Sequence, residues 1–438
     1  MRDLAFTLGL LVMLVYAFGR PHIGVLLWCW TALLIPNSYV YSFAKSIPFN
    51  FIVATFTLLM WVLSKERARI PFNGTVVTLI VFGVLGTVSA VFGIGTPEVT
   101  WVEWEKFIKM MIFAVVVSAI INSRARIDAL VWAILFSLGF HGVSEGIKFL
   151  LTGGGHRIWG PDGSIIGDNN HFALAILSLI PLVFYLYRQT THRALRVGLL
   201  GVGALLFFTV MGTFSRGGLI GLIAIVAWAF LHSPHKFRYL AAMIPLAAAL
   251  VAFAPDQWVK RMDTIEVASQ DTSFMGRVIA WKQSTVIALD HPVLGGGFHA
   301  VQDNLVWRQY AATRFHDLDF IPTDDPDPDG AHAAHSIYFQ VLGDMGFVGL
   351  SLFLLLNFLA WRNTVVVIKK VKGREDLAWA GQLAQYVQYS LIAYLVSGAA
   401  LSLAYFELMY ILFAVLASLR MIVDKACEPE KPFPGGRF

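Results

Sequence analysis

Long apolar runs alternate with short polar connections along most of the chain. The runs over residues 74–92, 127–151 and 335–361 contain few charged residues. Each is long enough for a helix to cross the apolar core of a bilayer. This pattern predicts an all-α, polytopic integral membrane protein with about twelve transmembrane helices.

The first apolar run, over residues 4–36, is interrupted by Gly19-Arg20-Pro21. Proline lacks a backbone donor and clashes with the preceding helical turn, so a helix break is expected here. Each half of the run is short for a membrane crossing. We therefore predict one broken crossing with a cytoplasmic N-terminus. Two full crossings would instead place the N-terminus outside.

Basic residues concentrate in every second connection between the apolar runs. Lysine and arginine favour the cytoplasmic connections of membrane proteins, so this alternation predicts the orientation of the helices. The clusters are Lys65/Arg67/Arg69, Arg124/Arg126, Arg188/Arg193/Arg196, Lys236/Arg238, Arg362/Lys369/Lys370/Lys372/Arg374 and Arg420/Lys425/Lys431/Arg437. The other connections are then predicted to face the periplasm from a bacterial inner membrane.

The chain divides into four predicted segments. Residues 1–254 hold transmembrane helices 1–10, and residues 335–423 hold helices 11–12 and a last span. Between helices 10 and 11, residues 255–334 form a large periplasmic loop with amphipathic helices. Residues 424–438 form a cytoplasmic tail. Twelve of the 28 acidic residues fall in the large loop, so its composition differs from that of the apolar runs.

Composition narrows the class of protein further. Hydrophobic residues make up 57% of the chain and charged residues 14%, whereas soluble domains carry about 25% charged residues. A cytosolic enzyme, a disordered tail protein and a secreted disulfide domain are therefore excluded. The two cysteines, Cys29 and Cys427, suit neither a disulfide nor a metal site. The net charge of +5 follows the predicted topology, so membrane lipids and not nucleic acid are the expected partners.

Arg216 lies in the polar segment Thr213–Gly218 between two apolar runs, on the predicted periplasmic side. An arginine at this position breaks the positive-inside trend and has no carboxylate within four residues. It either extends to lipid phosphates or forms a fixed cation for a ligand. The neighbouring Gly217 and Gly218 would let a ligand or another helix approach closely.

Arg277 and Trp281 belong to a predicted amphipathic helix over residues 275–289 of the large loop. They are four residues apart and therefore share one helix face. The sequence allows an ordinary surface helix with a solvated arginine, or a second functional cation.

His335 stands where the large loop enters a long apolar helix. Tyr338 follows on the same helix face. A histidine at this boundary either bonds a lipid headgroup or acts as a general base, because its pKa lies near neutral pH. His332 is close enough in sequence to compete for the second role.

A smaller predicted periplasmic loop, over residues 152–169, contains further candidates for substrate binding. Asp168 or Asn169 is expected to cap the following helix, but one cap does not explain the polar run that continues through Asn170 and His171. Arginine forks bind phosphate and tryptophan rings stack on sugars. The candidates in this loop are Arg157, Trp159, Asp168, Asn170 and His171.

No cofactor or metal site is predicted. Residues 325–330, with sequence DPDPDG, resemble the start of a calcium loop, but Ser336 stands where an EF-hand needs glutamate. A solvated acidic turn is the better interpretation. No P-loop or dinucleotide-binding fingerprint occurs, so ATP and nucleotide-sugar chemistry are not indicated.

Several short motifs together resemble the O-antigen ligase and polymerase superfamily, and its ligase branch in particular. They cover about residues 150–360, and their order, spacing and predicted sidedness carry the resemblance. Ser336 departs from the asparagine of many relatives. The motifs are Ser215-Arg216-Gly217-Gly218, Gly276-Arg277 with Trp281, Leu294-Gly295-Gly296-Gly297-Phe298, Ala334-His335-Ser336-x-Tyr338 and Gly343-x-x-Gly346-x-x-Gly349-Leu350.

The resemblance implies a metal-independent, inverting glycosyl transfer that completes lipopolysaccharide. The donor would be O-antigen on undecaprenyl pyrophosphate, and the acceptor would be lipid A–core at the periplasmic face. Matching the family pattern makes Arg216 and Arg277 pyrophosphate ligands and His335 the catalytic base.

Three other functions remain open. Two belong to the same superfamily, namely an O-antigen polymerase and a protein O-glycosylation ligase. A lipid-linked glycan transporter belongs to another class. A transporter should show inverted repeats or charges at mid-membrane, and the sequence contains neither.

Overall fold

The computed structural model describes residues 2–64, 70–232, 236–237 and 272–428. Its described part contains helices and connecting segments without a strand, as the apolar pattern predicts. The α-helices are α1 (Arg2–Ala17), α2 (Pro21–Leu34), α3 (Phe49–Leu63), α4 (Gly74–Val91), α5 (Pro97–Ile120), α6 (Arg124–Leu151), α7 (Asn169–Gln189), α8 (Arg193–Gly212), α9 (Arg216–His232), α12 (Thr272–Asp290), α13 (Asn304–Thr313), α14 (Ile337–Lys370), α15 (Ala378–Gly398) and α16 (Glu407–Ala426). The 3-10 helices are Pro36–Ser38, Phe43–Ser46, Ala300–Gln302, Phe315–Leu318 and Glu375–Leu377.

Some predictions concern residues outside the described ranges. They are residues 238–254 of one predicted span, residues 255–271 of the predicted large loop, and the basic residues Lys65, Arg67, Arg69, Arg238, Lys431 and Arg437.

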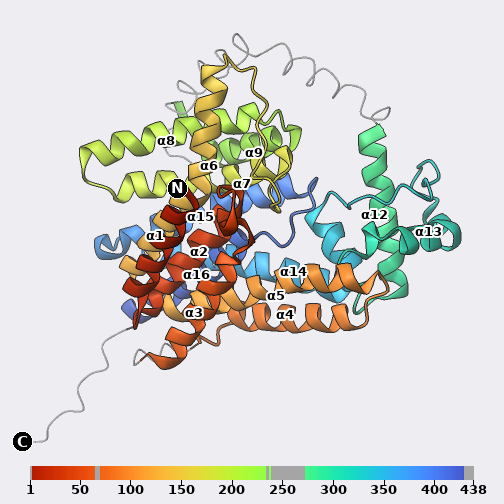
Figure 1. Cartoon of the computed structure of the whole chain (residues 1–438), viewed down its shortest axis with the longest axis horizontal. Helices are drawn as coiled ribbons and strands as arrows, with labels where there is room; N and C mark the ends of the chain where they lie inside the picture. Colours follow the sequence, from red (N-terminus) through yellow and green to blue (C-terminus); the bar gives the residue numbers. More distant parts are fainter. Residues whose placement is uncertain (1, 65–69, 233–235, 238–271, 429–438) are drawn as a thin grey trace, which may run out of the picture.

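Five of the described helices, namely α4, α6, α7, α8 and α14, are long and apolar enough to cross a membrane. Three shorter helices, α2, α3 and α9, are also apolar. These helices agree with a membrane protein, while the number of crossings stays a prediction. Helices α7, α15 and α16 pack with most of their residues buried and form the centre of the bundle (Figure 1).

The first two helices correct the expectation for residues 4–36. The chain does break at Gly19, but α1 and α2 form an antiparallel pair instead of one broken crossing. At one end, the Asp3 carboxylate accepts backbone hydrogen bonds from Tyr41 and Ser42, at 3.1 and 2.7 Å. At the other end, the Gly19 N–H contacts the sulfur of Met60, near the end of α3, at 3.4 Å. The start of α1 therefore lies beside the connection that follows α2.

Basic connections meet at one end of the bundle, which we call the basic end. There, Arg124 at the start of α6 donates to Gln189 at the end of α7, at 3.1 Å. Gln189 donates in turn to Gln382 in the first turns of α15, at 2.9 Å. Lys370 at the end of α14 pairs with Asp424 at the end of α16, at 2.7 Å. The described basic connections thus gather as the sequence pattern predicts.

The opposite end, which we call the loop end, carries the remaining connections. Ser38, after α2, donates to the carbonyl of Asp162 in the connection between α6 and α7, at 3.0 Å. The Ile94 N–H, after α4, bonds the carbonyl of Gly296 at 2.8 Å. Helices α12 and α13 form a small lobe beside this end (Figure 1). Val286, Ile287, Val306, Trp307 and Tyr310 provide most of the lobe's own apolar core.

Helix α14 is interrupted in its third turn, where the connection after α12 docks against it. Gly346 has φ 67° and ψ −167°, which ends the helical path locally. The backbone N–H of Gly296 bonds the carbonyl of Gly343 at 2.8 Å, and the N–H of Phe347 bonds the carbonyl of Pro292 at 2.9 Å. Two glycine-rich sequences therefore exchange backbone hydrogen bonds. Their contact joins the lobe to α14 and fixes the start of α14 at the loop end.

Candidate active site at the loop end

Helix α12 holds the backbone that leads into His335. The indole N–H of Trp281 donates to the carbonyl of Ala334 at 2.6 Å. Its ring stacks on Phe339, with centroids 5.1 Å apart and planes at 8°. Trp281 and Arg277 are one turn apart on α12, so the same helix presents Arg277 toward the start of α14.

His335 has a constrained backbone just before α14. Its φ of 44° lies in the left-handed region, which side chains with a Cβ rarely adopt. Its backbone N–H donates to the hydroxyl of Ser402 at 2.7 Å, in the connection between α15 and α16. Together with Trp281, this contact holds the strained backbone in place. Such strain is concentrated at functional sites.

The electrostatic environment of His335 shows which predicted residues come together. Burial lowers the pKa of His335, and Arg277, His171 and His332 lower it further, while Asp168 opposes them. The imidazole is therefore neutral at pH 7 and able to accept a proton. His332, the predicted competitor, packs edge-on against Trp307 in the lobe, with centroids 5.7 Å apart.

The start of α7 contributes polar groups to the same region. Asp168 is the N-cap of this helix, and its carboxylate accepts from the backbone N–H groups of Asn170 and His171, at 2.8 and 3.4 Å. Asn169 is buried, and its side chain donates to the carbonyl of Thr213 at 2.7 Å. Asn170 contacts Asn169 at 3.4 Å. Asn169, the first residue of α7, therefore joins this helix to the segment that contains Arg216.

Arg216 is the first residue of α9. Ser215 caps this helix, since its hydroxyl accepts from the N–H of Gly218 at 3.0 Å. The glycines serve helix packing. A Cβ on Gly218 would lie 2.9 Å from the Cβ of Ala173 on α7, and one on Gly221 would lie 2.0 Å from the hydroxyl of Ser397 on α15.

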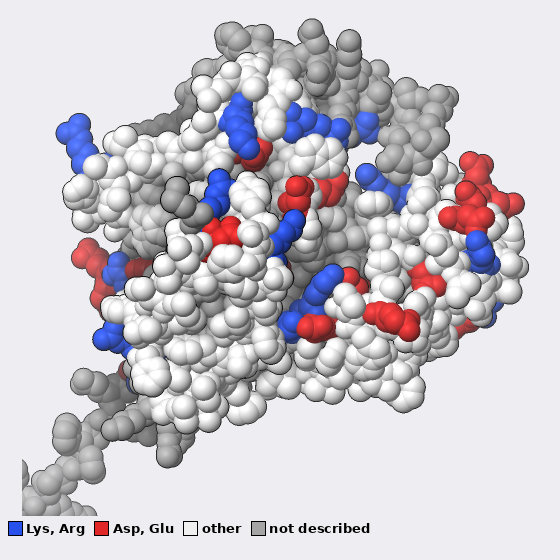
Figure 2. Space-filling view, viewed as in Figure 1, with Lys and Arg blue, Asp and Glu red and all other residues white. Residues whose placement is uncertain are grey.

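The last turn of α15 links the Arg216 segment to the His335 segment. Ser397 donates to the carbonyl of Gly217 at 3.0 Å. Two residues earlier, the carbonyl of Leu395 accepts from the hydroxyl of Tyr338 at 3.1 Å. Tyr338 thus points toward α15 and positions the helix that follows His335. Figure 2 shows a recess between the bundle and the lobe, with basic and acidic side chains along its rim.

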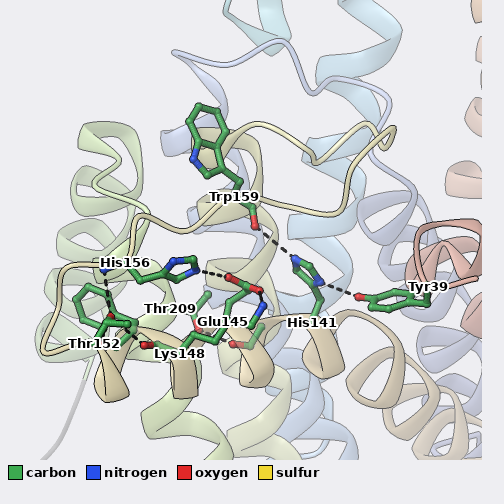
Figure 3. Close-up of polar contacts among 10 residues, drawn as sticks. Tyr39, His141, Glu145, Lys148, Thr152, His156, Trp159 and Thr209 are labelled. Carbon is green, nitrogen blue, oxygen red and sulfur yellow. Dashed lines mark hydrogen bonds and ion pairs between the residues drawn. The ribbon is translucent and has the colours of Figure 1, made fainter. Parts of the chain in front are cut away.

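The connection between α6 and α7 is anchored by residues that sequence reasoning did not identify. The ring of His141 bonds the carbonyl of Trp159 at 3.3 Å and the hydroxyl of Tyr39 at 2.7 Å. Glu145 pairs with His156 at 2.7 Å and with Lys148 at 2.6 Å (Figure 3). The sequence offered one sign of this network, because His141 and Glu145 are polar residues four apart in an otherwise apolar part of α6.

Sequence reasoning also missed Asn169 as a link between helices and Ser402 as the partner of His335. Asn169 was visible only as a cap candidate. Ser402 lies 67 residues from His335, so no local pattern connects them.

The acidic turn of the large loop has partners within the lobe. Asp329 pairs with Arg308, and the carbonyl of Asp327 accepts from the indole of Trp307 at 2.8 Å. Within the described ranges, no group of three or more histidine, cysteine and acidic residues is arranged to hold a metal ion. Asp327 and Asp329 thus contact Trp307 and Arg308 in the lobe.

These features define a helical membrane protein with a polar, arginine-containing site at one end. Residues 201–354 match the model of a family described as O-antigen ligase. Residues 1–191 match a family of unknown function. No curated protein matches the chain. The chain is therefore similar to the O-antigen ligase family over residues 201–354, and this matched part contains Arg216, Arg277 and His335.

Proposed function

We propose that the protein transfers a glycan from undecaprenyl pyrophosphate to lipid A–core. The reaction takes place at the periplasmic face of a bacterial inner membrane, where the loop end lies. The observation that supports this proposal is that Arg277, His171, Asp168 and His332 lie close enough to the half-buried His335 to shift its pKa, within or beside the part that matches the O-antigen ligase family. Asn169, next to Asp168, donates to the carbonyl of Thr213, three residues before Arg216, and we assign Arg216 to the same site.

The two arginines bind the pyrophosphate of the donor. Guanidinium groups form charge-assisted, often bidentate hydrogen bonds with phosphate oxygens. Negative charge develops on the pyrophosphate as the bond to the sugar breaks, so cations placed there stabilise the transition state more than the ground state. Arg216 and Arg277 start from different helices and enclose the leaving group from two directions.

His335 acts as the general base. An acceptor hydroxyl attacks the anomeric carbon, and His335 takes its proton as the glycosidic bond forms. The bond from the anomeric carbon to the pyrophosphate breaks at the same time, and the electron pair leaves with the lipid carrier. A single displacement inverts the anomeric configuration. The lowered pKa suits this role, because only the neutral imidazole accepts a proton.

The test uses the purified protein with lipid-linked glycan and lipid A–core, in the presence of EDTA. A ladder on lipid A–core supports the ligase. Longer glycan on the carrier alone would identify a polymerase, and a glycosylated protein acceptor would identify a protein ligase. If no acceptor receives glycan, the proposed glycosyl transfer is refuted. If activity is present without EDTA and lost with EDTA, metal independence is refuted.

Arg216→Ala and Arg277→Ala should each lower kcat by about 10²- to 10³-fold, as removal of one transition-state donor typically does. His335→Ala should lose transfer by a similar factor or more. Arg308→Ala is the matched control, because Arg308 is an exposed arginine paired with Asp329 in the lobe. Wild-type rates in all three site variants would contradict the assignment of roles.

A further inference from the structure

We infer that Trp159 and Arg157 form a binding site for a pyranose ring next to the reacting groups. This inference rests on the proposed glycan transfer and assigns a subsite within it. Trp159 is 48% exposed, although tryptophan is the largest apolar side chain. The guanidinium carbon of Arg157 lies 4.6 Å from the centre of its indole ring. The guanidinium thus covers one face of the indole, and about half of the residue stays exposed to a ligand.

The backbone of Trp159 is fixed on both sides. Its carbonyl accepts from Nε2 of His141, so Nδ1 of that ring accepts from the hydroxyl of Tyr39. Burial raises the pKa of Tyr39 to about 12, which keeps this hydroxyl protonated. Gly160 follows directly, and a Cβ there would lie 1.7 Å from the carbonyl oxygen of Ile166. Only glycine fits this turn.

Figure 3 shows the indole of Trp159 directed away from His141 and α6. A rigid backbone carrying an open aromatic ring is a preorganised binding element, because little conformational entropy is lost when a ligand stacks on it. A tryptophan that only marks a membrane interface needs no such anchoring. Asp162 and Gly163, which follow in the same loop, are exposed.

Arg157 adds a polar atom without a partner. Its Nε is buried and has no hydrogen-bond partner among the residues that the structure describes. Burying an unpaired donor costs free energy, and a ligand hydroxyl or ring oxygen would recover it. An aromatic face beside guanidinium donors suits a sugar, which has an apolar C–H face and hydroxyl groups at its edge.

The site lies close to the proposed catalytic group. The N–H of Gly160 bonds the carbonyl of Gly167 at 3.0 Å. Trp159 and Asp168 are each one residue from this bond, so their Cα atoms lie within about 15 Å. Asp168 acts electrostatically on His335. A short oligosaccharide would therefore reach from the indole to the reacting bond.

The experiment measures KM for the lipid-linked donor and for lipid A–core separately, using purified Trp159→Ala, Trp159→Phe and Arg157→Gln variants. Trp159→Ala should raise one of the two KM values by about 10- to 100-fold, as loss of an aromatic anchor typically does, with little change in kcat. Trp159→Phe keeps a ring and should stay near wild type. Arg157→Gln should raise the same KM value. The matched control is Trp101→Ala, an exposed tryptophan on α5 outside this network.

A rise confined to the acceptor KM assigns the site to acceptor sugar, and a rise confined to the donor KM assigns it to donor sugar. Binding of delipidated core oligosaccharide and of carrier-free repeat unit is measured on the same proteins by calorimetry. Unchanged KM values and unchanged binding in Trp159→Ala would overturn the inference while leaving the transferase intact. A wild-type protein without transfer would refute the function, and the binding data would still decide the subsite.

Discussion

At the scale of single residues, His335 combines a strained backbone with a chemically suited side chain. Its left-handed φ is held by Ser402 on one side and by the Trp281 bond to Ala334 on the other. The histidine and both arginines could be selected as candidates from the sequence, because charged groups beside apolar runs are rare. The partners that position them were not, because they lie far away in the chain.

The pH dependence of transfer should report the protonation state of His335. The neutral imidazole is the active form and its pKa is lowered, so activity should persist below pH 6.5, the ordinary histidine value, and fall as the pH drops through the lowered pKa. Arg277→Gln removes a nearby positive charge. The acidic limb of the kcat profile should therefore move to higher pH in this variant.

The control is Arg308→Gln, whose kcat–pH profile should have its acidic limb at the same pH as the wild type. An acidic limb at the same pH in wild type and in Arg277→Gln would show that another group controls the activity.

At the scale of elements, the interruption of α14 explains two glycine motifs together. A Cβ on Gly346 would lie 2.6 Å from the carbonyl oxygen of Pro292, and one on Gly295 would lie 2.5 Å from the backbone nitrogen of Gly346. Both glycines also have positive φ, of 67° and 65°. The motifs are thus the two sides of one backbone contact, which places the lobe and Arg277 next to His335.

Gly346→Ala should destabilise the protein. A side chain at this φ is strained by about 1–3 kcal/mol, and the contact with Pro292 adds to that. We expect the Tm of the purified protein to fall by about 5 °C or more in thermal scans, together with transfer activity.

Gly198→Ala on α8 is the matched control, because a Cβ there meets nothing within 4 Å. It should leave the Tm unchanged or slightly higher, since alanine favours helix. Equal Tm values for both variants would show that the α14 contact does not require glycine.

At the scale of the whole molecule, the helix ends separate into a basic end and a loop end. The alternation of basic clusters predicted this sidedness, and the Arg124, Gln189 and Gln382 chain confirms that distant basic connections meet. The antiparallel α1–α2 pair places the start of α1 at the loop end, beside Tyr41. The short length of each half of residues 4–36 favoured one broken crossing, but the two halves form separate helices that pair with each other and contact α3.

The sidedness is testable with the chain's own cysteines. Cys427 lies at the basic end and Cys29 is buried. A membrane-impermeant maleimide should therefore leave the wild-type chain unlabelled in spheroplasts and label it after lysis. Tyr41→Cys, at an exposed position of the loop end, should react in intact spheroplasts. Labelling of Cys427 before lysis would reverse the proposed orientation.

The helical class and the gathering of basic connections at one end could be predicted from the sequence, because apolar runs and charged residues can be recognised locally along the chain. Which residues come into contact depends on the tertiary fold. The Ser402 bond to His335, the docking of residues 292–297 on α14 and the His141 anchor of Trp159 join positions 18 to 67 residues apart. Such contacts depend on how helices pack against each other, and no periodicity in the sequence encodes that packing.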